Sequence, residues 1–300
     1  MNQLMSEAFW VQAGLLTLGI AAFFYVMQFM ITHKSFQWIA TGSLVFSILS
    51  FVSALIFRSI AAQYFALSNM YEALLVVVIG ITTAYVIFER WFKLNTLGWA
   101  VCLIALIMVF YAGSLPNDIN PLQPALQSYW RMIHVPPMML SYGFFTLAFL
   151  SSVAYLVTGN GCPENPMSGR ELYASSAGPA DENFGQSNSG QLAMSRLDLY
   201  DEITYRAIAS GFPFLLIGTI LGAVWANEAW GNYWSWDPKE SASLMTLLGY
   251  GAYLHMRING GHAKRTLAWV SVGGFVLVLL TFVGVNVWGF GSLHSYGSVK

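Results

Sequence analysis

The sequence predicts an all-α polytopic membrane protein of about eight transmembrane helices with an outward-facing Trp-rich loop. Of its 300 residues, 56% are hydrophobic and only 9% are charged, whereas soluble domains carry about 25% charged residues. The apolar residues gather in runs close to the roughly 20 residues that a helix needs to cross a bilayer. The net charge of −1 gives no reason to expect a nucleic-acid partner.

The eight apolar runs define one integral membrane domain that spans residues 1–300. They cover residues 8–31, 38–57, 71–88, 97–114, 136–157, 207–226, 239–257 and 267–288. The first run has no basic segment before it and no small-residue cleavage site after it, so we expect a retained helix rather than a signal peptide.

The distribution of Lys and Arg orients these helices, because inner loops carry an excess of both residues. With eight spans, one side of the membrane receives Lys34, Arg90, Lys93, Arg170, Arg196, Arg206, Arg257, Lys264 and Arg265. The other side receives Arg58, Arg131, Lys239 and Lys300. We therefore expect both termini and the loop 227–240 on the outer side, in the periplasm or a lumen.

The connections at 158–206 and 115–135 carry local signals. Residues 159–190 are rich in Gly, Ser, Asn and Pro, which is typical of disorder. Residues 194–206 space apolar side chains at near-helical intervals, which predicts a short interfacial helix before the sixth span. In the outer loop, Pro136 and Pro137 predict a break between residue 135 and the fifth span.

The most distinctive segment is 225–240, WANEAWGNYWSWDPKE. Trp230, Trp234 and Trp236 offer a large flat apolar surface with N–H donors at its edge, which suits a planar aromatic ligand at the membrane boundary. The alternative is an aromatic belt at the headgroup level, as many membrane proteins have. We call the predicted loop, residues 227–240, the Trp loop.

The end of the Trp loop is also the start of a helix. Asp237 is the expected N-cap, Pro238 the first helical residue and Glu240 the partner in a capping box. Cys102 and Cys162 form no C-x-x-C motif, which argues against a thiol–disulfide relay or a zinc site.

His134 and His294 fall on the same outer side as the Trp loop. Neutral imidazole is a common axial ligand of haem iron, so two histidines beside an indole surface could hold one haem. The alternative is that each is a polar anchor at the interface. His33 and His262 lie in inner loops, where a solvated side chain is the simplest interpretation.

His255 lies within the seventh span, roughly 25 Å from the Trp loop at 1.5 Å per residue. An ionisable residue at membrane depth indicates function by default; the alternative is a histidine that reaches the inner headgroups beside Arg257. Arg58 and Arg131 could pair with haem propionates, or they are plain interfacial charges.

The segment WGNYWSWDPKE at 230–240 resembles the WWD segment of the haem-handling family that contains CcsA (ResC), CcmC and CcmF. Three further segments are similar to the CcsA branch, namely NMYE at 69–72, YLHMR at 253–257 and GSLHSYG at 291–297. Together these matches cover most of the chain from residue 69 onward.

The resemblance implies a role in cytochrome c biogenesis with haem b as the substrate. His134 and His294 match the outer haem ligands, and His255 matches a membrane-embedded haem ligand. The expected haem-binding residues of the loop are Trp230, Trp234, Trp236 and Asp237. The implied partners are a CcsB (ResB)-like membrane protein, apocytochrome c and membrane lipids, in a bacterial inner membrane or a thylakoid.

Three other functions are open on the sequence. A CcmC- or CcmF-type protein hands haem to a chaperone. A small-molecule transporter uses the aromatic loop as a cage for its substrate. A structural subunit uses the loop only as a belt. Detection of bound haem would distinguish the first of these functions from the other two.

Overall fold

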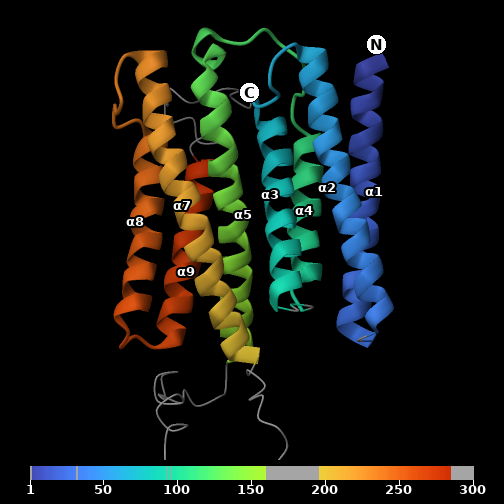
Figure 1. Ribbon diagram of the computed structural model, residues 1–300, viewed down its shortest axis with the longest axis vertical. Coiled ribbons are helices and arrows are strands. Elements are labelled where there is room, and N and C mark those ends of the chain that lie inside the picture. Colours follow the sequence, from blue (N-terminus) through green and yellow to red (C-terminus); the bar gives the residue numbers. More distant parts are fainter. Residues whose placement is uncertain (1, 32, 93, 95, 160–195, 285–300) are drawn as a thin grey trace, which may run out of the picture.

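The fold is a bundle of long helices, which the computed structural model describes for residues 2–31, 33–92, 94, 96–159 and 196–284. Figure 1 shows the helices running side by side along the long axis. The α-helices of these residues are α1 (Asn2–Ile31), α2 (Lys34–Ala62), α3 (Met70–Phe92), α4 (Gly98–Gly113), α5 (Tyr129–Thr158), α7 (Arg196–Trp230), α8 (Pro238–Asn259) and α9 (Lys264–Leu279). The 3-10 turn η1 (Pro124–Gln127) precedes α5, and the π-helical turn η2 (Leu280–Gly284) follows α9. A helix occupies the described part of every predicted span.

The surface of the bundle is that of a membrane protein, which confirms the predicted class. Six described helices are long and apolar enough to cross a bilayer, namely α1, α2, α3, α5, α7 and α9 together with η2. Large apolar side chains point outward, with Phe9 61% and Leu16 67% exposed on α1. The apolar helix α4 has only 16 residues, and α8 carries charged residues near both ends. The total of eight spans stays a prediction.

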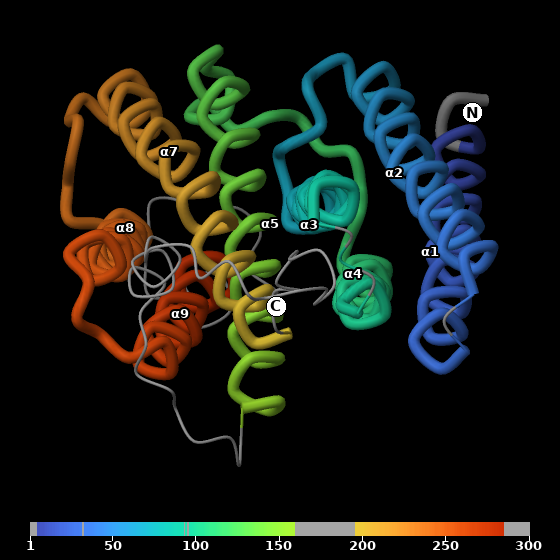
Figure 2. Tube along the Cα trace, turned by 60° about the horizontal axis from the view of Figure 1, so that its bottom comes forward, coloured from blue at the N-terminus to red at the C-terminus, as the bar shows by residue number. Residues whose placement is uncertain are grey.

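The helices form two groups, α1–α4 on one side and α5 with α7–α9 on the other, as Figures 1 and 2 show. The main contact between the groups is made by α3 and α5. At their crossing the backbones of Gly80 and Gly143 touch: a Cβ added to Gly143 would lie 2.5 Å from the carbonyl carbon of Gly80. Small residues permit this approach in membrane helices. The glycine pair therefore sets the spacing between the two groups.

The predicted break at Pro136 and Pro137 is wrong, because α5 already begins at Tyr129. The Ser128 Oγ accepts a hydrogen bond from the Trp130 N–H and caps this helix. Proline inside a helix costs about 3 kcal/mol, and the packing of α5 on α3 and α7 keeps the helix continuous. The extension matters because its first turns carry residues of the candidate site.

The helix predicted over residues 194–206 is present from Arg196, and it is continuous with the sixth span, since α7 runs from Arg196 to Trp230. Tyr200, Ile203 and Ile208 are buried and belong to the same hydrophobic core as the rest of the bundle. The apolar face thus continues along the helix without a turn. The predicted disordered segment lies, from residue 160 on, outside the described residues.

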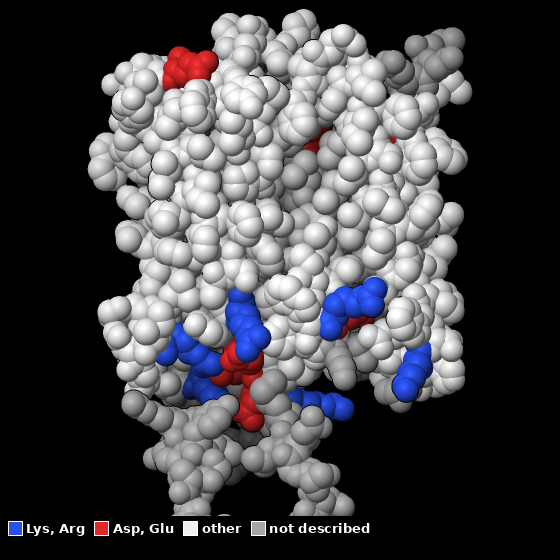
Figure 3. Space-filling view, in the orientation of Figure 1, with Lys and Arg blue, Asp and Glu red and all other residues white. Residues whose placement is uncertain are grey.

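The charged residues separate towards the two ends of the bundle. Figure 3 shows Lys and Arg gathered at the lower end, opposite the Trp loop. There the Arg257 guanidinium donates to both Asp201 oxygens, at 2.9 and 2.8 Å, and Lys264 pairs with Asp198 at 2.7 Å. These pairs join the ends of α7, α8 and α9.

Candidate functional site

A cavity of about 170 Å³ lies between the two helix groups at the end of the bundle that carries the Trp loop. Its walls come from α3, α4, α5, α7, α8, η2 and the Trp loop, and most of the lining surface is apolar. Three of the residues expected from the sequence, His134, Arg131 and Trp234, line this one cavity. The structure therefore brings a histidine and a cation from the first turns of α5 to the same cavity as an indole 100 residues further along the chain.

The His134 ring is held in a defined orientation by α7. Its Nδ1 lies 2.7 Å from the Gly218 carbonyl oxygen. A carbonyl oxygen only accepts hydrogen bonds, so Nδ1 must carry the proton and the ring lone pair is on Nε2. Gly222 leaves room for the ring, since a Cβ there would lie 2.7 Å from the His134 Cε1. Nε2 is thus the nitrogen that can bind a metal.

Trp225 is the site residue that the sequence analysis missed. Its indole stacks on the His134 ring, with centroids 5.9 Å apart and planes 24° from parallel. It is 4% exposed, and its Nε1–H donates to the Ala125 carbonyl at 3.0 Å. A pattern in the sequence could have identified Trp225. One face of a helix carries Gly218, Gly222 and Trp225, because they are spaced by four and three residues. That face packs on His134.

The tryptophans of the predicted platform take different positions. Trp230 ends α7 and packs on Trp225 at 5.1 Å, and Trp234 lines the cavity. Trp236 is 70% exposed and meets Trp234 edge-on at 5.8 Å. The indoles therefore do not form one flat surface. Trp234 and Tyr233 are the aromatic residues of the loop that line the cavity.

The predicted capping box at the end of the Trp loop is present. The Asp237 Oδ2 accepts from the Lys239 N–H at 3.0 Å. The Glu240 Oε2 accepts from the backbone N–H groups of Ser235 and Asp237 at 2.8 and 3.2 Å. Asp237 and Glu240 are both buried. These carboxylates fix the loop to α8, so the N-cap assigned to Asp237 is confirmed.

We expect Glu240→Ala to release the Trp loop from the start of α8, because the backbone donors of Ser235 and Asp237 lose their acceptor. Loss of a helix cap costs about 1 kcal/mol. Thermal unfolding in detergent, monitored by circular dichroism, measures this loss of stability. Ser241→Ala is the control, since the Ser241 hydroxyl only donates to the Trp236 carbonyl at 3.3 Å. Equal stability of Glu240→Ala and the wild type would contradict the capping role.

The two arginines suggested as propionate contacts differ in position. Arg131 lines the cavity, with its Nε donating to the Leu126 carbonyl at 2.8 Å and its Nη1 to the Leu67 carbonyl at 2.6 Å. Arg58 is outside the lining and pairs with Glu72 at 2.6 Å and Glu7 at 3.0 Å. Its guanidinium is engaged by these carboxylates, so only Arg131 remains a candidate for propionates.

The other two histidines of interest lie elsewhere. His255 is exposed near the far end of α8, and its Nε2 lies 2.8 Å from the Asn259 Nδ2. His255 follows Asp237 by 18 positions, so the helical rise separates them by roughly 27 Å, and His255 is no part of the cavity. His294, with the segment 291–297, lies outside the described residues.

A comparison with known families decides what kind of protein this is. The family described as "Cytochrome C assembly protein" matches residues 67–293, well over half of the chain. The chain belongs to this cytochrome c assembly family. The match includes the cavity, the Trp loop and His255.

Relatives within the cytochrome c assembly family match along the whole chain. "Cytochrome c biogenesis protein CcsA" of Synechocystis sp. is 36% identical over 99% of both chains. The protein of the same name from Mesostigma viride is 38% identical, again over 99% of both. The predicted resemblance to the CcsA branch is confirmed, and this family member is a cytochrome c biogenesis protein of the membrane.

A solved structure shares the fold of this cytochrome c assembly protein. "Cytochrome c Heme Lyase CcmF" superposes with a TM-score of 0.62 at 18% identity. The superposition covers 94% of this chain and 47% of that one, so this chain spans about half of its length. At this identity the likeness supports the helical architecture alone.

Proposed function

We propose that this chain binds haem b as a substrate beside the Trp loop, with His134 and His294 as the iron ligands. The observation that carries the proposal is the Nδ1 hydrogen bond to Gly218, which assigns the ring lone pair to Nε2 in a side chain that lines a mostly apolar cavity. Metal-ligating histidines in proteins are held by their other nitrogen in this way. His294 enters through the resemblance of segment 291–297.

The lining of the cavity suits the rest of the haem molecule. Trp225 and Trp234 offer apolar aromatic surface to a flat macrocycle. Arg131 offers a guanidinium to a propionate. Trp230 packs on Trp225, and Asp237 holds the end of the loop in place. The exposed Trp236 is available to an approaching partner.

His255 serves as an earlier haem site in this proposal. Its exposure near the far end of α8 supports this, because a ligand from a second membrane protein can reach it. That partner is a CcsB (ResB)-like protein. Haem then moves from the end of the bundle rich in Lys and Arg towards the end with the Trp loop. The gathering of Lys and Arg at the opposite end supports a periplasmic or lumenal position for the Trp-loop end, because inner loops carry an excess of both residues.

Together with this partner, the chain attaches haem to apocytochrome c. Each cysteine thiol adds across a haem vinyl group: a C–S bond forms, the thiol hydrogen goes to the other vinyl carbon, and no net oxidation occurs. The residues of this chain bind and orient the haem, hold the iron through imidazole and exclude water. They supply no covalent intermediate.

The test is the absorption spectrum of the protein purified in detergent after expression with its partner and supplied haem. We expect a Soret band and, after reduction with dithionite, sharp α and β bands. A colourless protein under these conditions would overturn the proposal. It would leave the Trp loop as an aromatic belt or as part of a transport site.

A further inference from the structure

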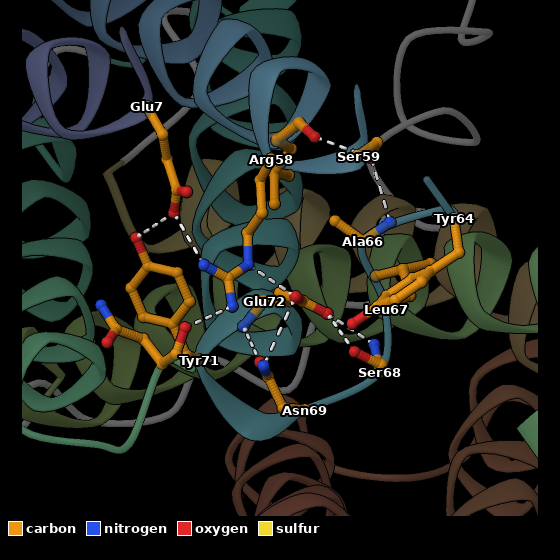
Figure 4. Close-up of polar contacts among 12 residues, drawn as sticks. Glu7, Arg58, Ser59, Tyr64, Ala66, Leu67, Ser68, Asn69, Tyr71 and Glu72 are labelled. Carbon is orange, nitrogen blue, oxygen red and sulfur yellow. Dashed lines mark hydrogen bonds and ion pairs between the residues drawn. The ribbon is translucent and has the colours of Figure 1, made fainter. Parts of the chain in front are cut away.

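A buried charge cluster lies next to the cavity without lining it. Arg58 of α2 pairs with Glu7 of α1 and Glu72 of α3, and its Nη2 donates to the Asn117 carbonyl at 2.7 Å. The side chains of Glu7, Arg58 and Glu72 are 8%, 2% and 0% exposed. Figure 4 shows the guanidinium between the two carboxylates, with Tyr71 donating to Glu7. One arginine thus joins three helices and the α4–α5 connection.

The second oxygen of Glu72 holds the turn before α3. Its Oε2 accepts from the Ser68 N–H at 2.6 Å and from the Ser68 hydroxyl at 3.0 Å. In return the Glu72 N–H donates to the Asn69 Oδ1 at 3.0 Å. The Asn69 side chain thus caps the first turn of α3, and the Glu72 carboxylate holds Ser68, the residue before Asn69. Arg58 therefore fixes the very carboxylate that orders this turn.

The same turn is a wall of the cavity. Leu67, Ser68, Asn69 and Met70 all line it. The Leu67 carbonyl accepts from the Arg131 Nη1 at 2.6 Å, so the turn also holds the cation that lines the cavity. A continuous series of short contacts thus runs from Glu7 through Arg58 and Glu72 to the turn, and from the turn to Arg131.

We infer that Arg58 is a positioning residue of the haem site. It acts through Glu72 on the turn 67–70, and through the Leu67 carbonyl on the guanidinium of Arg131. Glu7 and Arg58 precede residue 67, where the family match begins, so the α1–α2 hairpin contributes to the site from outside that segment. The inference rests on the proposed haem-binding function and extends it.

Arg58→Lys tests this, because lysine keeps the charge and loses the fork that bridges two carboxylates and a carbonyl. With haem b as the probe, we expect binding on the order of ten-fold weaker and a shifted reduced α band. Glu72→Gln is the second variant, because it leaves the Arg58–Glu7 pair in place, and we expect the same change. It replaces Arg58→Lys if that protein does not fold.

The matched control is Glu89→Gln at the opposite end of α3. Glu89 is 3% exposed and accepts from Tyr25 at 3.0 Å and Thr41 at 2.8 Å, so its loss also perturbs a buried network. It lies roughly 25 Å from Glu72 along the helix, and we expect an unchanged haem spectrum. Wild-type affinity in a folded Arg58→Lys, or an equal loss in Glu89→Gln, would overturn the inference. A colourless wild type would instead overturn the proposed function.

Discussion

Replacing His134 by alanine will remove the sharp reduced α band of the haem bound beside the Trp loop. The imidazole Nε2 is the only nitrogen of His134 that can reach iron while Nδ1 donates to Gly218. Without it the iron loses one axial ligand, and we expect haem retention to fall by at least about ten-fold. Reduced-minus-oxidised spectra of protein purified with its partner measure the change.

His33→Ala is the control for this experiment. His33 is exposed at the other end of the bundle, where its ring accepts from the Ser35 N–H as the cap of α2. The reduced-minus-oxidised spectrum of His33→Ala should equal that of the wild type. Combining His134→Ala with His294→Ala should remove the remaining signal of this site. An unchanged α band in His134→Ala would show that the iron is held elsewhere.

A second large effect is expected at the crossing of α3 and α5. In Gly143→Ala the new methyl group would lie 2.5 Å from the Gly80 carbonyl carbon and 2.6 Å from its oxygen, so the two backbones must separate. Overpacking of this kind costs about 1–3 kcal/mol. Because α3 and α5 join the two helix groups around the cavity, we expect both stability and haem retention to fall.

Gly42→Ala provides a matched comparison within α2. A Cβ at Gly42 has no described heavy atom within 4 Å, and alanine favours a helix interior by about 0.5–1 kcal/mol over glycine. Thermal midpoints in one detergent should therefore move in opposite directions for the two variants. A Gly143→Ala protein as stable as the wild type would mean that α3 and α5 do not approach as closely as the structure has them.

The features predictable from the sequence are those that depend on neighbouring residues. Apolar runs locate the helices, because each helix satisfies its own backbone hydrogen bonds in the membrane. The capping box of Asp237 and Glu240 was recognisable from residue types three positions apart. The WWD segment indicated the family for the same reason, since its residues are consecutive.

Other features were decided only by the tertiary structure. Pro136 and Pro137 predicted a break, yet packing against α3 and α7 keeps α5 helical through them. The partner of His134 is a carbonyl 84 residues away, and Arg58 reaches Glu7 across 51 residues. No local pattern encodes such pairs. The sequence by itself therefore determined the helices, their caps and the family, which rest on short-range chemistry. Which side chains line the cavity, and which arginine is buried in ion pairs, followed from how the two helix groups pack around the Gly80–Gly143 crossing.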